Sequence, residues 1–400
     1  MALEIIGGKT VTPYRVIEEG YIRVEEGEIT AVGPLSTAGG EGRGLEAVEG
    51  GATERVDVHG KIVMPGFIDL HVHGGGGADT MDATYDALNT MSLVHAAGGT
   101  TAMVPATVSA PMERVMRSVE AVEEAMRRGV RGARVLGIHL EGPYISRAQR
   151  GAQEEEYIRE PTREEVQELV AHAATIKAIT AAPEVPGVFG LAREMSSRGV
   201  LMSIGHSDAT VYDVEKALEA GFTHVTHLYS GCSTVKRVNA FRYPGVIEAA
   251  YLFDGLSVDI IADGKHLPPY LIKLILKNKG VGSVNVITDA MRAAGMPPGK
   301  YKLGDQEVIV DQGVAWLPDR SAFAGSVSTM GEMAKVLIGD VGLSLTEVAA
   351  MTSTNPAKLL GLKGKGALAV GKDADVVILN DDFSVYATIV EGKFAYGPRK

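Results

Sequence analysis

The chain has 400 residues, 45% of them hydrophobic and 22% charged, which is ordinary for a soluble globular protein with a large core. Its formal net charge of −11 argues against nucleic acid or an anionic membrane as a partner. The single cysteine, Cys232, excludes an intrachain disulfide, and because neither a run of about 18 apolar residues nor a signal-peptide pattern is present, we expect a cytoplasmic protein without a membrane span.

Both ends of the chain predict short β-strands. In residues 1–62, β-rich pieces alternate with turns, and the sequences EEGE (25–28) and VHGK (58–61) predict hairpins. Residues 368–400 have the same character, with NDD and EGK as turns. We therefore expect one small β-sandwich domain formed by residues 1–62 and 368–400 together.

The middle of the chain, residues 63–367, alternates predicted strands and helices. Eight apolar runs that end in polar residues predict the strands: FIDLHVHG, TTAMVPAT, RVLGIHLEGP, IKAITAAPE, LMSIGHSDA, HVTHLYS, LSVDIIADG and VNVITDAM. Helical patterns separate most of them, and capping boxes predict helix starts at Thr162 and Ser344. One helix face is predicted from Val115, Met116, Val119, Val122 and Met126. Eight such units predict an α/β protein with a (β/α)8 TIM barrel, and a doubly wound open sheet is the alternative.

Residues of metal-ligating type recur where the predicted strands end, which is the face on which a barrel builds its active site. They are His71, His73, Glu141, His206, His227 and Asp289. His71 and His73 share one side of the first strand, because side chains alternate along a strand. Each residue alone would be a weak signal, but their shared position predicts one site with nitrogen and oxygen ligands for a divalent metal.

The glycines at 74–77 are expected to let the following loop turn away and leave this site open. Of the other histidines, His139 shares a strand face with Glu141 and could support the ligands, whereas His224 should point elsewhere. We expect His59 in a turn, His95 in a buried helix position and His172 on a helix surface. Cys232 is expected to be a small apolar filler.

Ten motifs along nearly the whole chain resemble the amidohydrolase superfamily, and most closely its N-acetylglucosamine-6-phosphate deacetylases. They are PGFIDLHVHG, GIHLEGPY, TAAPE, SIGHSDA, THLYS, IADGKH, VITDAMRAAG, AGSVSTM, TSTNPAKLLGL and GKDADVVIL. The resemblance implies an enzyme that hydrolyses N-acetyl-D-glucosamine 6-phosphate to acetate and D-glucosamine 6-phosphate. It also implies a homodimer.

The resemblance implies roles for single residues as well. Glu141, His206 and His227 correspond to metal ligands, and Asp289 corresponds to the catalytic aspartate. Because some members also carry the motif of His71 and His73 and bind a second ion, we expect one or two ions of Zn, Fe, Mn or Co per subunit. The implied substrate contacts are Ala152, Gln153, Ser230, Gly231, Arg242, Asp263, His266, Phe323, Ala324 and Gly325. Arg242 and His266 among them correspond to phosphate contacts.

The chain departs from the family pattern around the sixth predicted strand. Ser230 replaces an asparagine, and extra residues bring Lys236 and Arg237, which predict either a solvated basic loop or an altered anion pocket. Gln153 stands where some members have a histidine. These departures bear on which sugar is bound. The resemblance favours the glucosamine substrate, N-acetylgalactosamine 6-phosphate is second, and hydrolysis of another N-acyl or cyclic amide is a further possibility. A non-enzymatic sugar-phosphate-binding protein is the third class, against which Asp289 argues.

Overall fold

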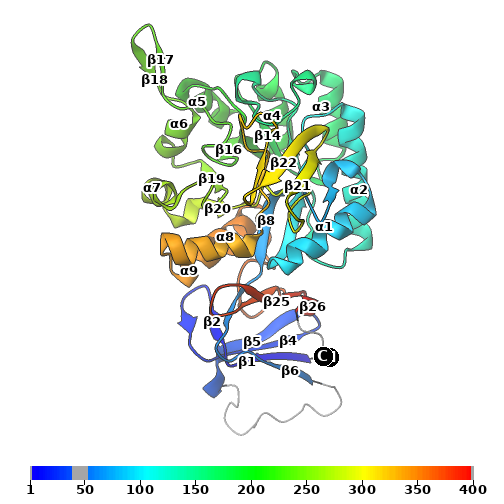
Figure 1. Cartoon of the computed structure of the whole chain (residues 1–400), viewed down its shortest axis with the longest axis vertical. Helices are drawn as coiled ribbons and strands as arrows, with labels where there is room; N and C mark the ends of the chain where they lie inside the picture. The colour runs from blue at the N-terminus through cyan, green and yellow to red at the C-terminus, as the bar shows by residue number, and fades with distance from the viewer. Residues whose placement is uncertain (1, 38–52, 398–400) are drawn as a thin grey trace.

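The computed structural model describes residues 2–37 and 53–397. Figure 1 shows two parts, a larger one in which helices surround parallel strands and a smaller one made of strands from both ends of the chain. No helix within the described ranges is long and apolar enough to cross a membrane. The prediction of an α/β architecture for the middle of the chain is confirmed.

The larger part contains a curled parallel sheet whose strands follow one another in chain order. One sheet has the order β12-β11-β8, and the other has the order β13-β14-β15-β16-β19-β20. Single parallel bridges, Ala106 with His139 and Val72 with Ala290, link the two sheets. The strands are β8 (Phe67–Val72), β11 (Thr100–Pro105), β12 (Arg134–Val135), β13 (Ile138–Glu141), β14 (Ile176–Ala181), β15 (Leu201–Ile204), β16 (Phe222–Val225), β19 (Ser257–Ile260) and β20 (Val284–Val286). Each of the eight predicted runs therefore overlaps at least one of these strands.

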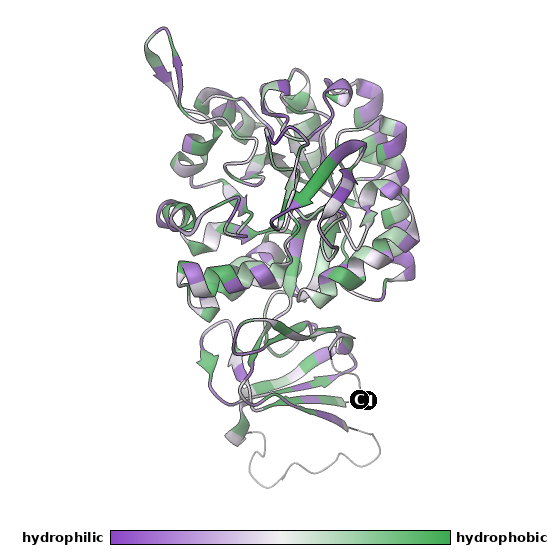
Figure 2. Ribbon diagram, in the orientation of Figure 1, coloured by the Kyte–Doolittle hydropathy of each residue, from purple (hydrophilic) through white to green (hydrophobic). Residues whose placement is uncertain are grey.

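Helices surround this sheet, and Figure 2 shows that the strands are mostly hydrophobic whereas the helices carry both classes of residue. They are α1 (Tyr85–Ala97), α2 (Met112–Arg128), α3 (Arg163–Ala171), α4 (Val188–Ser196), α5 (Val211–Glu219), α6 (Val246–Leu252), α7 (Pro269–Lys279), α8 (Met330–Val336), α9 (Leu345–Ala349) and α10 (Asn355–Leu359). The predicted face of α2 is buried except for Met126, which is half-buried. Both predicted capping boxes are present, at Thr162 with Glu165 and at Ser344 with Glu347.

The smaller part consists of two sheets, with the orders β5-β4-β1-β6 and β26-β25-β24-β7-β2-β3. Their strands are β1 (Ala2–Ile6), β2 (Lys9–Val11), β3 (Val16–Ile17), β4 (Gly20–Glu25), β5 (Glu28–Pro34), β6 (Thr53–Asp57), β7 (Ile62–Pro65), β24 (Val376–Leu379), β25 (Val385–Val390) and β26 (Lys393–Tyr396). Side chains from both chain ends share one core, as when Ile5 and Ile22 pack with Val376 and Ile389. In addition, the C-terminal strand β24 pairs antiparallel with β7, which comes from the N-terminal segment.

The predicted hairpin at VHGK is wrong. The flanking strands β6 and β7 belong to different sheets, because β6 pairs in parallel with β1 while β7 pairs with β2 and β24. A turn motif specifies a reversal of the chain but does not select the strand partners, which tertiary packing decides. The EEGE hairpin is confirmed by the pairing of Glu25 with Glu28.

Smaller strands lie in the loops after the parallel strands. Strands β9 (Gly74–Gly75) and β10 (Ala78–Asp79) pair in the glycine-rich loop. A hairpin of β17 (Lys236–Val238) and β18 (Phe241–Tyr243) projects from the larger part (Figure 1). An antiparallel sheet of β21 (Gly299–Leu303), β22 (Gln306–Asp311) and β23 (Val314–Trp316) follows β20, and the sequence patterns did not predict it.

Candidate active site

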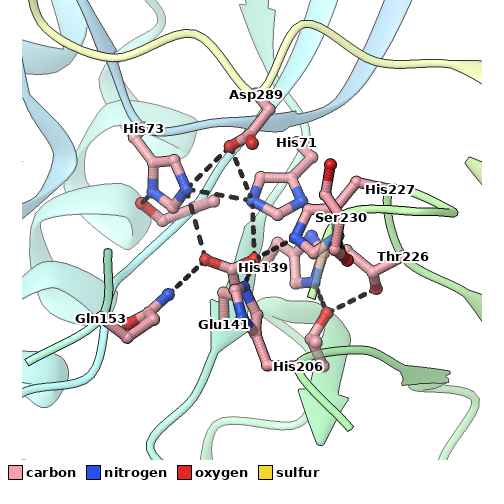
Figure 3. A network of polar contacts seen from close by, with 12 residues as sticks. His71, His73, His139, Glu141, Gln153, His206, Thr226, His227, Ser230 and Asp289 are labelled. Atoms are coloured by element: carbon pink, nitrogen blue, oxygen red, sulfur yellow. Dashed lines mark hydrogen bonds and ion pairs between the residues drawn. The ribbon is translucent and has the colours of Figure 1, made fainter. Parts of the chain in front are cut away.

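The six residues predicted from strand ends converge in one place (Figure 3). His71 lies in β8 and Glu141 ends β13, while the other four follow their strands by one to three residues: His73, His206, His227 and Asp289. All six are buried, with exposed fractions from 0% to 8%. Their ligand atoms form two groups that could hold a metal ion, and Glu141 belongs to both: His71, His73 and Glu141, and Glu141, His206 and His227.

The carboxylate of Glu141 lies at the centre of this arrangement. Its Oε1 is 2.8 Å from Nε2 of His227 and 3.1 Å from Nε2 of His206. Its Oε2 is 3.4 Å from Nε2 of His73, and Nε2 of His71 is 3.6 Å from Oε1. Oε1 therefore faces three imidazoles, those of His71, His206 and His227, and Oε2 faces the imidazole of His73.

Asp289 lies on the opposite side of His71 and His73 from Glu141 in Figure 3. Its Oδ1 is 3.1 Å from Nε2 of His73 and 3.6 Å from Nε2 of His71. Asp69, in β8, connects this strand to the segment that carries Asp289. Its carboxylate accepts hydrogen bonds from the hydroxyl of Thr288 at 2.5 Å and from the backbone N–H of His71 at 3.3 Å. This tie fixes the distance between the ends of β8 and β20.

Backbone carbonyls determine the tautomers of three imidazoles. In each of the three the Nδ1 atom faces a carbonyl oxygen, which can only accept, so Nδ1 must carry the proton. The pairs are His73 with Ala106 at 3.2 Å, His206 with Gln149 at 2.8 Å, and His227 with Ser230 at 3.1 Å. In the neutral ring the Nε2 lone pair then points at a carboxylate oxygen, and two acceptors repel one another. A positive charge between them removes that repulsion, so these residues fit a divalent metal ion.

The ionisation of the cluster agrees with this requirement. Although burial opposes its charge, the electrostatic attraction of the neighbouring His206 imidazole holds the pKa of Glu141 well below its usual value. In the same way the hydrogen bond with His73 outweighs burial and lowers the pKa of Asp289 to about 2. The Glu141 carboxylate, against the effect of burial, raises the pKa of His227 to about 9. Both carboxylates are therefore anionic at neutral pH and hold positive charge beside them.

Three of these residues have left-handed backbone conformations, with φ values of 46° at His206, 30° at His227 and 48° at Asp289. Such values are uncommon for residues with a side chain and cluster at functional sites. They turn the chain sharply at the end of the strand, which directs each side chain toward the shared centre.

The glycine-rich loop, predicted to turn away from the site, packs closely against the loop that follows β20. The backbone N–H groups of His73 and Gly74 both donate to the carbonyl of Ala290 at 2.8 Å. A Cβ on Gly74 would lie 2.5 Å from the oxygen of Ala78 and 2.6 Å from the backbone nitrogen of Arg292. These glycines therefore allow close contact between the loops that carry His73 and Asp289.

A cavity of about 180 Å³ opens above the cluster. Seven of the ten predicted substrate contacts line it: Ala152, Gln153, Ser230, Gly231, His266, Phe323 and Gly325. The sequence analysis missed Gly151, Leu303 and Ala322, which also line it. Leu303 belongs to β21, for which the sequence patterns gave no signal, whereas Gly151 and Ala322 are neighbours of predicted positions.

Three predicted substrate contacts do not line the cavity. Ala324 is fully buried between two lining residues. Asp263 accepts a hydrogen bond from Nδ1 of His266 at 2.7 Å, so it holds that ring in place. Arg242 lies exposed on the β17–β18 hairpin, where its guanidinium donates to the carbonyl of Ala240 at 2.7 Å. The structure of a single chain therefore does not bring Arg242 to the cavity.

The remaining candidates lie outside the ligand groups. His139 is buried against His71, with ring centroids 4.5 Å apart, and its Nε2 contacts Thr180. His224 points away and lies 2.8 Å from Asp259. Burial raises the pKa of the Cys232 thiol to about 12, which agrees with a filler rather than a nucleophile.

In the basic loop after β16, Lys236 is paired with an acidic residue and Arg237 is exposed. The ammonium group of Lys236 forms an ion pair with Asp208 and donates to its carbonyl at 2.7 Å. Arg237 is exposed on the hairpin. Neither residue lines the cavity, whose lining within the described residues includes no lysine or arginine.

A model of the Amidohydrolase family matches residues 62–395. The N-acetylglucosamine-6-phosphate deacetylase of Bacillus subtilis is 37% identical over 391 residues, which cover 96% of this chain and 95% of that protein. The N-acetylgalactosamine-6-phosphate deacetylase of Escherichia coli O157:H7 is 31% identical and covers 95% of each chain. A solved mutant of N-acetyl-D-glucosamine-6-phosphate deacetylase from Mycobacterium smegmatis, in complex with N-acetyl-D-glucosamine-6-phosphate, has a TM-score of 0.88 at 29% identity and covers 98% of this chain and 99% of its own. These matches confirm the resemblance of the sequence motifs, and the chain belongs to the amidohydrolase family.

Proposed function

We propose that this protein is a metal-dependent deacetylase that hydrolyses N-acetyl-D-glucosamine 6-phosphate to acetate and D-glucosamine 6-phosphate. The observation that carries the proposal is the pair of ligand groups sharing Glu141, with Asp289 beside them on the floor of the cavity. Relatives named for this activity match nearly the whole chain. An amide bond needs an activated nucleophile and stabilisation of the developing charge, and this site suits both needs.

The residues that would hold metal are His71, His73, Glu141, His206 and His227. One or two ions of Zn, Fe, Mn or Co suit this set of imidazole and carboxylate ligands. A bound divalent ion would lower the pKa of water toward about 7 and polarise the acyl carbonyl.

Asp289 is the proposed catalytic residue. Its carboxylate, ionised at neutral pH, takes the proton of the attacking water at Oδ1 and returns it to the leaving amide nitrogen. Because His73 and His71 face the same oxygen, at 3.1 Å and 3.6 Å, the carboxylate is held in one orientation. Only 8% of its surface is exposed, and the residue lines the cavity in which the substrate would bind.

The phosphate group is assigned to His266 and Arg242. Asp263 binds Nδ1 of His266, so that the opposite nitrogen, Nε2, can meet a phosphate oxygen. Arg242 suits bidentate phosphate binding but lies outside the cavity of its own chain. A homodimer in which the hairpin of one copy reaches the cavity of the other would bring it there. The exposed apolar residues Val238 and Phe241 on this hairpin support such a contact.

The proposal extends to the architecture and location. The parallel strands in chain order, linked by the bridges at Val72 and Ala106, support a closed (β/α)8 barrel over residues 63–367. The two sheets of the smaller part support a β-sandwich domain over residues 1–62 and 368–400. The cytoplasmic location stays a prediction.

The second candidate substrate is N-acetylgalactosamine 6-phosphate. One relative from Escherichia coli is named for this activity, and Ser230, which replaces the asparagine of the family pattern, lines the cavity. A shorter side chain there removes an amide donor that could select one epimer of the sugar.

The test is acetate release across a panel of substrates, coupled to metal analysis of the purified protein. The panel contains N-acetylglucosamine and N-acetylgalactosamine, each with and without a 6-phosphate. We expect the highest kcat/KM for N-acetylglucosamine 6-phosphate. Equal turnover with and without phosphate would refute the roles of His266 and Arg242, and activity only on other N-acyl amides would refute the proposed substrate.

A further inference from the structure

Gln153 lies at the edge of the cavity with only 5% of its surface exposed, next to the centre of the ligand cluster. It follows the short helix η3 (Arg147–Gln149) and belongs to none of the parallel strands. Its side chain nevertheless reaches both the loop after β11, at Ser109, and the end of β13, at Glu141.

These two contacts establish which way the amide group points. The backbone N–H of Ser109 donates to one end of the Gln153 side chain at 2.6 Å, and a backbone N–H can only donate. That end must be the carbonyl oxygen Oε1. The other end is therefore the NH₂ group, and it donates to Oε2 of Glu141 at 2.5 Å (Figure 3).

The bond to Oε2 distinguishes the two oxygens of Glu141. Oε1 faces Nε2 of His71, His206 and His227, and Oε2 faces Nε2 of His73 and the Gln153 amide. A rotation of the Glu141 carboxylate about its Cγ–Cδ bond would break the hydrogen bond from the Gln153 amide and exchange the positions of Oε1 and Oε2. A neutral N–H donor can orient the carboxylate and leave its negative charge available to a metal ion, whereas a hydrogen-bond acceptor at this place would repel the carboxylate.

We propose that Gln153 is a positioning residue of the metal centre, because its amide holds Glu141 with Oε2 toward His73 and Oε1 toward the other three imidazoles. The inference rests on the proposed function, since it assumes that Glu141 binds metal. It assigns to Gln153 a role that precedes substrate binding and differs from a contact to the acyl group. Partners that orient a ligand in this way typically contribute about 10- to 100-fold to metal affinity.

The experiment compares metal binding by the full-length wild type and Gln153→Met after removal of metal with a chelator. Methionine has a similar length but no donor, so we expect a 10- to 100-fold weaker Kd for Mn²⁺ by calorimetry without substrate. The visible absorption of the Co²⁺ form should also change. Gln153→His should restore binding, because Nδ1 can accept from Ser109 while Nε2–H donates to Glu141. Gln167→Met, on the exposed face of α3, is the matched control and should bind as the wild type does.

Each outcome decides a different statement. Wild-type affinity and an unchanged Co²⁺ spectrum in Gln153→Met would overturn this inference while leaving the proposed function intact. Failure of the wild type to bind any of the divalent ions would overturn the proposed function itself. If Gln153→Met does not fold, Gln153→Asn supplies the comparison, because it keeps the amide but draws it back by one methylene. Asn must then weaken Mn²⁺ binding, and unchanged binding would refute the inference.

Discussion

Substitution of Gly74 by alanine tests whether close contact between two loops positions the catalytic residues. Gly74 has no left-handed φ, so alanine meets no conformational penalty there and only the space around its Cβ matters. That Cβ would lie 2.5 Å from the oxygen of Ala78, 2.6 Å from the nitrogen of Arg292 and 2.8 Å from its Cα. Ordinary contact begins at 3.4 Å, so the shortfalls are 3.4 − 2.5 = 0.9 Å, 0.8 Å and 0.6 Å.

All three atoms belong to backbone, which cannot rotate away as a flexible side chain would. The two Arg292 atoms lie in the loop after β20, so this loop and the loop after β8 must separate by several tenths of an ångström. The 3.1 Å contact between His73 and Asp289 changes with them. Overpacking of this kind costs about 1–3 kcal/mol of folding stability. A misplacement near 1 Å at a reacting group can lower the rate about 100-fold. We expect both effects in Gly74→Ala.

The assay is kcat/KM for acetate release, together with the melting temperature and metal content of the variant. Gly190→Ala is the matched control, because no atom lies within 4 Å of its added Cβ and the residue is exposed in α4. Alanine in a helix should stabilise that variant by about 0.5–1 kcal/mol and leave activity unchanged. Wild-type activity and melting temperature in Gly74→Ala would refute the close-contact explanation for this glycine.

Three further predictions concern the chemistry. Asp289→Asn should lower kcat by about 100- to 10,000-fold while metal content, measured by mass spectrometry, is retained; a loss below tenfold would contradict its role as the base. Exhaustive chelation should abolish acetate release and lower the melting temperature, and Mn²⁺ at 100 times its Kd should restore about 2.7 kcal/mol of stability; full activity of the stripped protein would exclude a metal mechanism. Arg242→Ala should lower kcat/KM for the phosphorylated substrate about 10- to 100-fold without affecting the unphosphorylated sugar, and equal effects on both would exclude a phosphate contact.

The parallel strands could be predicted because each is a buried apolar run that ends in polar residues. Phe67–Val72, for example, is buried at every position and His73 follows it at once. The partners of β6 and β7 could not be predicted. The two strands flank a turn, but β6 pairs with β1 and β7 pairs with β24, and only the folded chain brings these partners together. The antiparallel strands β21–β23 were missed because the strands of the middle region were predicted from apolar runs. Strands β21 and β22 instead alternate buried or half-buried side chains with more exposed ones.

The six strand-end residues of the site could be predicted because side chains alternate between the two sides of a strand and the C-terminal ends of successive parallel strands meet on one face. The residues that orient them have no such signal. Gln153 reaches Glu141 from a loop twelve residues along the chain, and Asp69 connects β8 to Thr288 across 219 residues. Arg242 shows a different limit of the sequence: a motif match implied a phosphate contact, but the hairpin places the residue outside the cavity of its own chain, so the contact stays a prediction that needs a second copy.

The hydrogen bonds at Nδ1 hold the imidazole rings in the orientation that metal binding would require, so the rings need not rotate when a cation binds. The acceptors for His73, His206 and His227 are backbone carbonyls on three separate segments, so the ring orientations depend on the fold rather than on neighbouring side chains. A ring that loses its second proton can offer only its Nε2 lone pair toward the carboxylates. Folding places two carboxylates and these oriented imidazoles in one buried volume, where protonated imidazole holds positive charge beside Glu141. A divalent ion would supply that charge in place of the protons, so metal binding at this site would be coupled to proton release.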